Sequence, residues 1–125
     1  MNKSALVAED NPALSRVIGF TMRKAGFRVE QARDGLEAWE HAQDQTFDLV
    51  ITDQQMPEMS GLELCANLRQ QEKHQNTPVV LLTAKGMELD TERIKQTHGI
   101  SEIIIKPFSP TELTSVAKNL MSETV

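Results

Sequence analysis

Aromatic residues, cysteine and long apolar runs are all scarce in this chain. The 125 residues include no Tyr, one Trp and four Phe, so aliphatic side chains must fill the core. The one cysteine, Cys65, cannot form an internal disulfide, which favours a reducing compartment. No apolar stretch approaches the ~20 residues of a membrane-spanning helix, and the first residues lack the apolar run of a secretory signal. We therefore expect a cytoplasmic protein without membrane contact.

The length, composition and charge of the chain indicate one globular domain. A chain of 125 residues is typical of a single domain, here residues 1–125. Hydrophobic residues at 39% and charged residues at 25% are globular values. The net charge of −5, from 13 basic and 18 acidic residues, argues against direct nucleic-acid binding, because phosphate backbones select basic surfaces.

Short apolar runs alternate with amphipathic stretches along the chain. We interpret the runs at 5–8, 27–29, 49–51, 79–82 and 103–105 as strands. Some are almost continuously apolar, which is typical of strands buried on both faces of a parallel sheet. The strand–helix order, repeated five times, predicts an α/β fold with a doubly wound five-stranded parallel sheet and five helices.

Helix signals support this order. Asp34, Ser60 and Ser109 each precede a Glu by three residues, the pattern of a capping box. Gly26 and Gly99 lie where helix C-caps are expected. The weakest helix is expected over 87–98. On the first helix we expect one buried face, formed by Leu14, Val17, Ile18, Thr21 and Ala25.

Polar side chains end four of the expected strands: Glu9-Asp10, Asp53, Thr83 and Lys106. Sites in doubly wound sheets form at the carboxyl ends of strands, so these residues are expected to converge. Clustered carboxylates repel unless neutralised, and a small carboxylate cluster suits Mg²⁺. A central carboxylate can then attack phosphorus, while a lysine and a hydroxyl offset charge on the phosphoryl oxygens.

Four segments resemble the receiver domain of two-component response regulators. They are 7–11, 48–61, 82–84 and 105–108, and the most specific is Asp53-x-x-Met56-Pro57-x-Met59-x-Gly61. The resemblance runs from about Lys3 to Leu120. It implies a CheY-like, flavodoxin-like three-layer sandwich and a phosphorylation-dependent signalling switch in a two-component phosphorelay.

The resemblance also implies roles for single residues. Asp53 would accept the phosphoryl group, and Mg²⁺ would be held by the side chains of Glu9, Asp10 and Asp53 with the backbone carbonyl of Gln55. Thr83 would bind a phosphoryl oxygen.

Lys106 would form an ion pair with the phosphoryl group, and its peptide bond to Pro107 would be cis. The donor would be a phosphohistidine of a histidine kinase or phosphotransfer protein. The signal would pass to a downstream protein target.

The sequence departs from the family where the output signal arises. Ile103 occupies the position of the usual switch aromatic, and the usual Gly-Ala-Asp-Asp segment reads Gly-Ile-Ser-Glu at 99–102. The surface expected to change is formed by the fourth helix, fifth strand and fifth helix. It would also support a monomer or a weak dimer.

Two other classes of function remain as alternatives. An aspartate-nucleophile phosphatase typically needs a second Asp two positions after the nucleophile, where this chain has Gln55. A flavodoxin-like or pseudo-receiver binding module would not need the full set of strand-end residues. We therefore expect no enzyme with a separate substrate, only a domain that catalyses its own phosphorylation and dephosphorylation.

The sequence also predicts roles for several residues outside this set. Gln55 and Lys85 flank the expected path of the hydrolytic water and should influence the lifetime of the phosphoryl group. The three histidines lack metal-ligand spacing and are expected to face solvent: His41, His74 and His98. Cys65 is expected to be a small core residue.

Overall fold

The computed structural model describes residues 3–84 and 91–122. In this part of the chain five parallel strands form one sheet in the order β2-β1-β3-β4-β5. The strands are β1 (Lys3–Ala8), β2 (Phe27–Ala32), β3 (Leu49–Asp53), β4 (Val79–Ala84) and β5 (Glu102–Lys106). The predicted doubly wound parallel sheet is confirmed.

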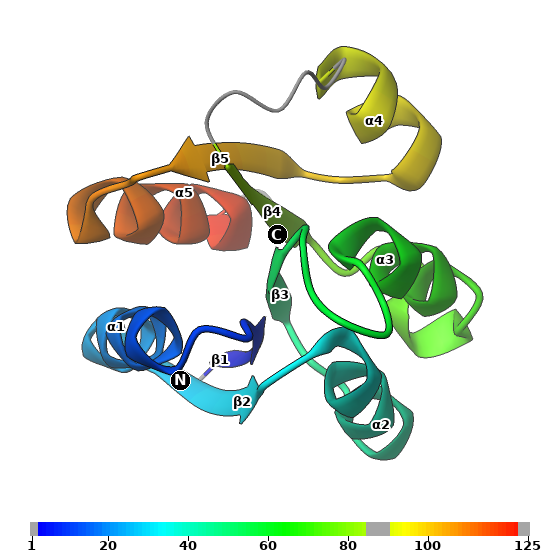
Figure 1. Ribbon diagram of the computed structural model, residues 1–125, viewed down its shortest axis with the longest axis horizontal. Coiled ribbons are helices and arrows are strands. Elements are labelled where there is room, and N and C mark those ends of the chain that lie inside the picture. The colour runs from blue at the N-terminus through cyan, green and yellow to red at the C-terminus, as the bar shows by residue number, and fades with distance from the viewer. Residues whose placement is uncertain (1–2, 85–90, 123–125) are drawn as a thin grey trace.

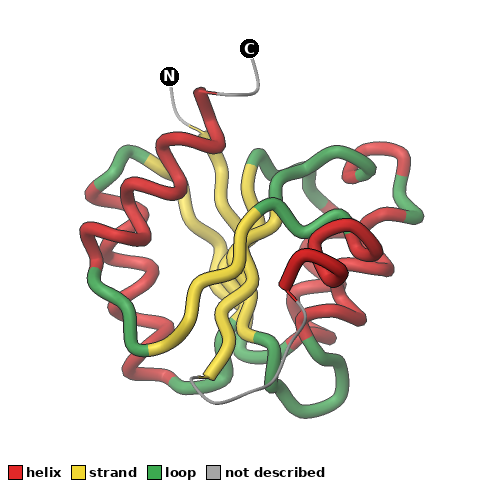
Figure 2. The backbone as a smooth tube through the Cα atoms, turned by 90° about the horizontal axis from the view of Figure 1, so that it is seen from above, coloured by secondary structure: helices red, strands yellow, loops and turns green. Residues whose placement is uncertain are grey.

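Helices cover both faces of the sheet and make three layers (Figures 1 and 2). They are α1 (Pro12–Lys24), α2 (Gly35–Asp44), α3 (Gly61–Arg69), α4 (Thr91–His98) and α5 (Pro110–Ser122), with a short 3-10 helix, η1 (Glu72–His74). Helices α1 and α5 lie on one face, and α2, α3 and α4 lie on the other (Figure 1). The expected helix over 87–98 is seen from Thr91, and 87–90 fall outside the described residues.

Alternating side chains of the central strands build the two halves of the core. On β1, Val7 packs in a cluster with Ile18 of α1 and Leu113 of α5. Its neighbour Leu6 packs in the other cluster with Leu64 of α3. These side chains are fully buried, because helices cover both faces of the strand. The continuous apolar runs are thus explained by burial on two sides.

Two apolar residues are less buried than predicted. Val17 is 47% exposed, because the buried stripe of α1 runs through Ile18, Thr21 and Met22 and leaves Val17 beside it. Ile105 is 53% exposed, although it continues the apolar run of β5. Its strand lies at the edge of the sheet, where only β4 pairs with it among the described strands. Three isoleucines in a row therefore did not mean burial on both faces.

The predicted helix boundaries are largely confirmed. Ser60 and Glu63 form a reciprocal capping box at α3, and the Ser109 hydroxyl accepts a hydrogen bond from Glu112 N–H at 3.0 Å. Gly26 and Gly99 adopt φ values of 102° and 67° after α1 and α4. This left-handed conformation favours glycine at helix ends. No helix in the described ranges is both long and apolar enough to cross a bilayer.

Candidate functional site

The carboxyl ends of the central strands carry the predicted acidic cluster. Glu9 directly follows β1, and Asp53 is the last residue of the adjacent strand β3. Glu9 is 2% exposed and Asp53 5% exposed, whereas Asp10 is exposed. One carboxylate oxygen from each of the three lies within 4.8 Å of the others. The structure therefore brings together the three acidic residues that the sequence analysis selected.

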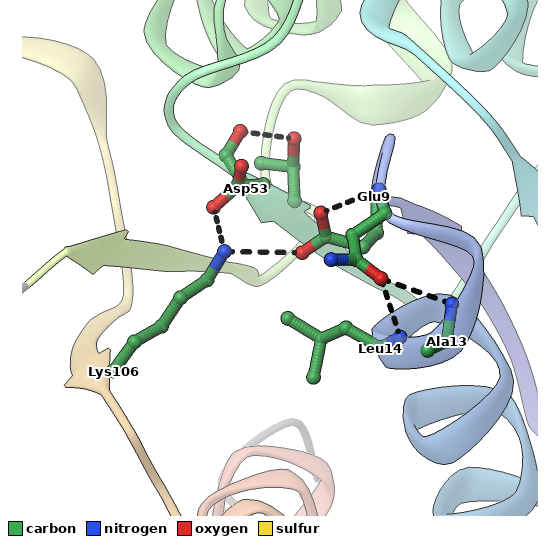
Figure 3. Close-up of polar contacts among 7 residues, drawn as sticks. Glu9, Ala13, Leu14, Asp53 and Lys106 are labelled. Atoms are coloured by element: carbon green, nitrogen blue, oxygen red, sulfur yellow. Dashed lines mark hydrogen bonds and ion pairs between the residues drawn. The ribbon is translucent and has the colours of Figure 1, made fainter.

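Lys106 reaches this cluster from the end of β5. Its Nζ atom lies 2.6 Å from Asp53 Oδ1 and 3.2 Å from Glu9 Oε1 (Figure 3). Burial favours the neutral amine, but the hydrogen bond to Asp53 and the charges of Glu9 and Asp53 outweigh it and raise the pKa of Lys106. One ammonium thus faces three carboxylates, and negative charge remains in excess.

Glu9 is held in place by the chain that follows it. Its Oε2 atom accepts a hydrogen bond from Asn11 N–H at 3.1 Å. Asn11 in turn caps α1, because its Oδ1 accepts from Ala13 N–H at 3.0 Å and Leu14 N–H at 3.1 Å (Figure 3). Burial, opposed by the Asn11 hydrogen bond and reinforced by the Asp53 charge, raises the pKa of Glu9. A cation bound at the cluster would favour the ionised form of Glu9, because it would offset the charge of Asp53 and the cost of burial.

Thr83 lies near the end of β4, one residue beyond Leu82, which pairs with Asp53 in the sheet. The Thr83 side chain is buried, and its hydroxyl has no hydrogen-bond partner among the described residues. Buried hydroxyls are nearly always hydrogen-bonded. A buried hydroxyl without a partner among the described residues thus lies near the carboxyl edge of the sheet.

The loop after β3 forms one side of the site. Gln55 is exposed on this loop, and Glu58 has a left-handed φ of 72°. The loop and Asp10 line a surface cavity of about 480 Å³. The Lys106–Pro107 bond is cis, as the family resemblance implied.

Ile103, at the position of the usual switch aromatic, lies on β5 and packs against the core. Ile103 lies opposite Leu81 in the β4–β5 ladder and packs, partly buried, against the core on the α2–α3 side. It thus occupies a packed position rather than a free surface. Lys85, expected to influence the hydrolytic water, lies outside the described residues.

One expectation about the histidines is wrong. His74 is fully buried rather than solvent-facing. Its ring is enclosed because Phe47 N–H donates to Nε2 at 3.2 Å and Nδ1 lies 2.7 Å from Gln71 Oε1. This contact joins η1 to the start of β3, far along the chain, so local spacing could not reveal it. Cys65 is buried, as predicted.

A doubly wound parallel sheet with an acidic cluster and a lysine at its carboxyl edge defines a receiver-type α/β domain. A family model described as "Response regulator receiver domain" matches residues 5–118. The chain belongs to this family and is a receiver domain of two-component systems.

Curated relatives include much longer proteins. The "Hybrid signal transduction histidine kinase D" of Dictyostelium discoideum is 43% identical over 117 residues, which cover 94% of this chain and 7% of that protein. "Transcriptional regulatory protein SrrA" of Staphylococcus aureus is 32% identical over 125 residues, which cover 99% of this chain and 50% of that protein. This chain thus spans half or less of the length of these relatives.

Solved structures agree on the fold. CheY4 of Vibrio cholerae, a chemotaxis response regulator, is 28% identical with a TM-score of 0.88, covering 96% of this chain and 99% of that one. The receiver domain of the sensor histidine kinase PA1611 from Pseudomonas aeruginosa PAO1 is 30% identical with a TM-score of 0.86, covering 98% and 99%. That receiver domain is described with a magnesium ion coordinated in its active-site cleft.

Proposed function

We propose that this receiver domain, residues 1–125 as one domain, switches by accepting a phosphoryl group on Asp53. One observation carries the proposal. Asp53 Oδ1 lies 2.6 Å from Lys106 Nζ, while the Asp53 carboxylate also belongs to a cluster within 4.8 Å of Glu9 and Asp10. Glu9 also pairs with Lys106, at a longer distance of 3.2 Å, but its other carboxylate oxygen accepts the hydrogen bond from Asn11 N–H.

The residues of the cluster suit Mg²⁺. The carboxylates of Glu9, Asp10 and Asp53 are hard oxygen ligands with excess negative charge, and Gln55 would add its backbone carbonyl. When bound, Mg²⁺ would neutralise these carboxylates and the oxygens of an incoming phosphoryl group. The magnesium ion described in the cleft of the related PA1611 receiver domain supports this assignment.

The chemistry then follows from the positions of the side chains. An Asp53 carboxylate oxygen forms a bond to phosphorus as the phosphorus–nitrogen bond of a phosphohistidine breaks, and the leaving imidazole takes up a proton. The Lys106 ammonium pairs with a phosphoryl oxygen, and the unpartnered Thr83 hydroxyl donates to another. Hydrolysis reverses the modification when water attacks phosphorus, Asp53 leaves as a carboxylate and inorganic phosphate is released.

The partners follow from this chemistry. The donor is a histidine kinase or a phosphotransfer protein, in line with the kinase relatives. The domain catalyses only its own phosphorylation and dephosphorylation and has no separate substrate. It works in the cytoplasm and binds neither nucleic acid nor membrane directly.

The output surface belongs to α4, β5 and α5. The Thr83 hydroxyl and the packed Ile103 side chain would carry the change from Asp53 to this surface. A downstream protein target reads it, and the domain is a monomer or a weak dimer through the same surface.

Incubation with acetyl phosphate and Mg²⁺ tests the proposal. The intact mass of the wild-type domain is expected to rise by one phosphoryl group, and EDTA should prevent the rise. Asp53→Asn should show no rise, because an amide cannot form the acyl phosphate. Asp44→Asn, which removes one carboxylate at the end of α2, is the matched control and should behave as wild type. A folded wild-type domain that gains no mass, or an Asp53→Asn variant that does, contradicts the proposal.

A further inference from the structure

Gln54, the residue after Asp53, closes the loop between β3 and α3. Its backbone N–H donates to Leu82 O at 2.8 Å, and its carbonyl accepts from Gly61 N–H at 3.0 Å. Its side-chain Oε1 accepts from Leu62 N–H at 2.9 Å. Gln54 therefore makes two hydrogen bonds to the start of α3. Residues 55–60 form the loop that these two hydrogen bonds close.

The same residue completes the capping of α3. A helix leaves its first N–H groups without partners in the helix. Ser60 Oγ accepts from Glu63 N–H at 3.1 Å, and Glu63 Oε1 accepts from Ser60 N–H at 2.9 Å. Gln54 binds the two N–H groups between them, those of Gly61 and Leu62. Every N–H group from residue 60 to 63 thus has a protein partner.

The start of α3 also touches the backbone of Asp53. A Cβ atom on Gly61 would lie 2.5 Å from Asp53 O and 2.8 Å from a Leu81 methyl group. The Thr52 hydroxyl donates to the same Asp53 carbonyl at 3.0 Å. Because this contact leaves no free space, a shift at the start of α3 displaces the peptide that carries Asp53.

We propose that Gln54 is a positioning residue for the metal site. This inference rests on the proposed function, because it concerns the Mg²⁺ that Asp53 and the Gln55 carbonyl would bind. Its side-chain amide fixes the start of α3 against the end of β3 and so sets the direction of the next peptide, that of Gln55. As a neutral acceptor it does this without adding a fourth carboxylate beside Asp10, which lines the same cavity.

The test removes the acceptor and keeps the bulk. Gln54→Met has a side chain of similar length that cannot accept the Leu62 N–H bond. Its Mg²⁺ dissociation constant, measured by isothermal titration calorimetry, is expected to rise about tenfold, as for other residues that orient metal ligands. The Mg²⁺ concentration that half-saturates phosphorylation by acetyl phosphate should rise by the same factor. The rate at saturating Mg²⁺ should stay within about twofold, because the nucleophile itself is intact.

Two further variants separate positioning from simple loss of helix stability. Ser60→Ala removes another cap of the same helix but leaves the bonds of Gln54, so its Mg²⁺ dissociation constant should stay within about twofold of wild type. Gln54→Glu keeps an oxygen acceptor for Leu62 N–H and should bind Mg²⁺ at least as tightly as wild type. Should Gln54→Met fail to fold, Gln54→Ala replaces it.

The outcomes distinguish this inference from the function on which it rests. If wild type binds Mg²⁺ and is phosphorylated, but Gln54→Met has an unchanged dissociation constant, the positioning role is overturned and the proposed function stands. Equal weakening in Gln54→Met and Ser60→Ala also overturns it, because the cause is then general to the helix. If folded wild type neither binds Mg²⁺ nor gains a phosphoryl group, the proposed function itself fails.

Discussion

The two ends of the parallel sheet differ in how completely their polar side chains are paired. At the carboxyl end, Lys106 pairs with two of the three clustered carboxylates, and the buried Thr83 hydroxyl has no partner among the described residues. At the amino end, Asp48 Oδ2 accepts from Ser4 N–H at 2.8 Å. His74 there is buried with both ring nitrogens in contact with polar partners.

Arg69 adds two hydrogen bonds to the network at the amino end of the sheet. Arg69 donates to His74 O at 2.8 Å and to Gly99 O at 2.7 Å, so one side chain joins η1 to the loop before β5. Satisfied polar networks of this kind make a fold rigid and specific. The carboxyl end carries excess negative charge by contrast, which a bound cation would offset. One end of the sheet thus stabilises the fold, and the other carries the excess negative charge on which the proposed function rests.

Removing the His74 ring should produce the largest loss of stability. His74→Ala leaves the Phe47 N–H group and the Gln71 side chain without their partner and opens a cavity, at a cost of about 3 kcal/mol of unfolding free energy. Urea unfolding measures this loss. His41→Ala, on α2, should change the unfolding free energy by about 0.5 kcal/mol or less. Phosphorylation of folded His74→Ala by acetyl phosphate should match wild type, and a parallel loss of phosphorylation would show that the two ends are not independent.

This contrast marks what could be predicted from sequence. The strands, the order of elements and the acidic cluster were predicted because each rests on a local pattern: an apolar run, a cap, or a polar residue at a strand end. His74 was misjudged because its partner Phe47 comes from a different part of the chain. Ile105 was misjudged because an apolar run does not reveal which strand lies at the edge.

Gln54 shows the same limit at the site itself. The family motif includes its position, but only as an unspecified residue between Asp53 and Met56. Its role depends on the path of the seven-residue loop 54–60 between β3 and α3, which brings Leu62 N–H back to the Gln54 side chain. The one available signal was a polar side chain next to Asp53, where a buried strand ends.

Lowering the pH should reduce the unfolding free energy through His74. The loss per pH unit should be smaller than the loss caused by His74→Ala. Burial, with the nearby charges of Lys73 and Arg69, lowers the pKa of His74. The unfolded chain, with a histidine pKa of about 6.5, therefore binds a proton that the folded protein resists. The contribution of the neutral His74 ring to the unfolding free energy is therefore fully present above about pH 6.5. It is lost as the pH falls below that value, by at most about 1.4 kcal/mol per pH unit.

The measurement is the unfolding free energy between pH 7 and 5 in wild type and in His74→Ala. Glu9, whose pKa is raised, contributes with the opposite sign, since its protonation on acidification relieves burial and repulsion. That contribution is common to both proteins. The difference between their slopes isolates His74, and identical slopes would contradict a buried neutral ring.

The most direct test of the contrast is the effect of Mg²⁺ on unfolding in wild type and in Asp10→Asn, whose site is short of one exposed carboxylate. Without Mg²⁺, the variant should be at least as stable as wild type, because repulsion at the carboxyl end is reduced. At ten times its dissociation constant, Mg²⁺ should add about 1.4 kcal/mol to wild type, and it should add clearly less to Asp10→Asn at the same concentration. Equal stabilisation of both proteins by Mg²⁺, or a marked loss of stability in the Mg²⁺-free variant, would contradict a cation site at the carboxyl end of the sheet.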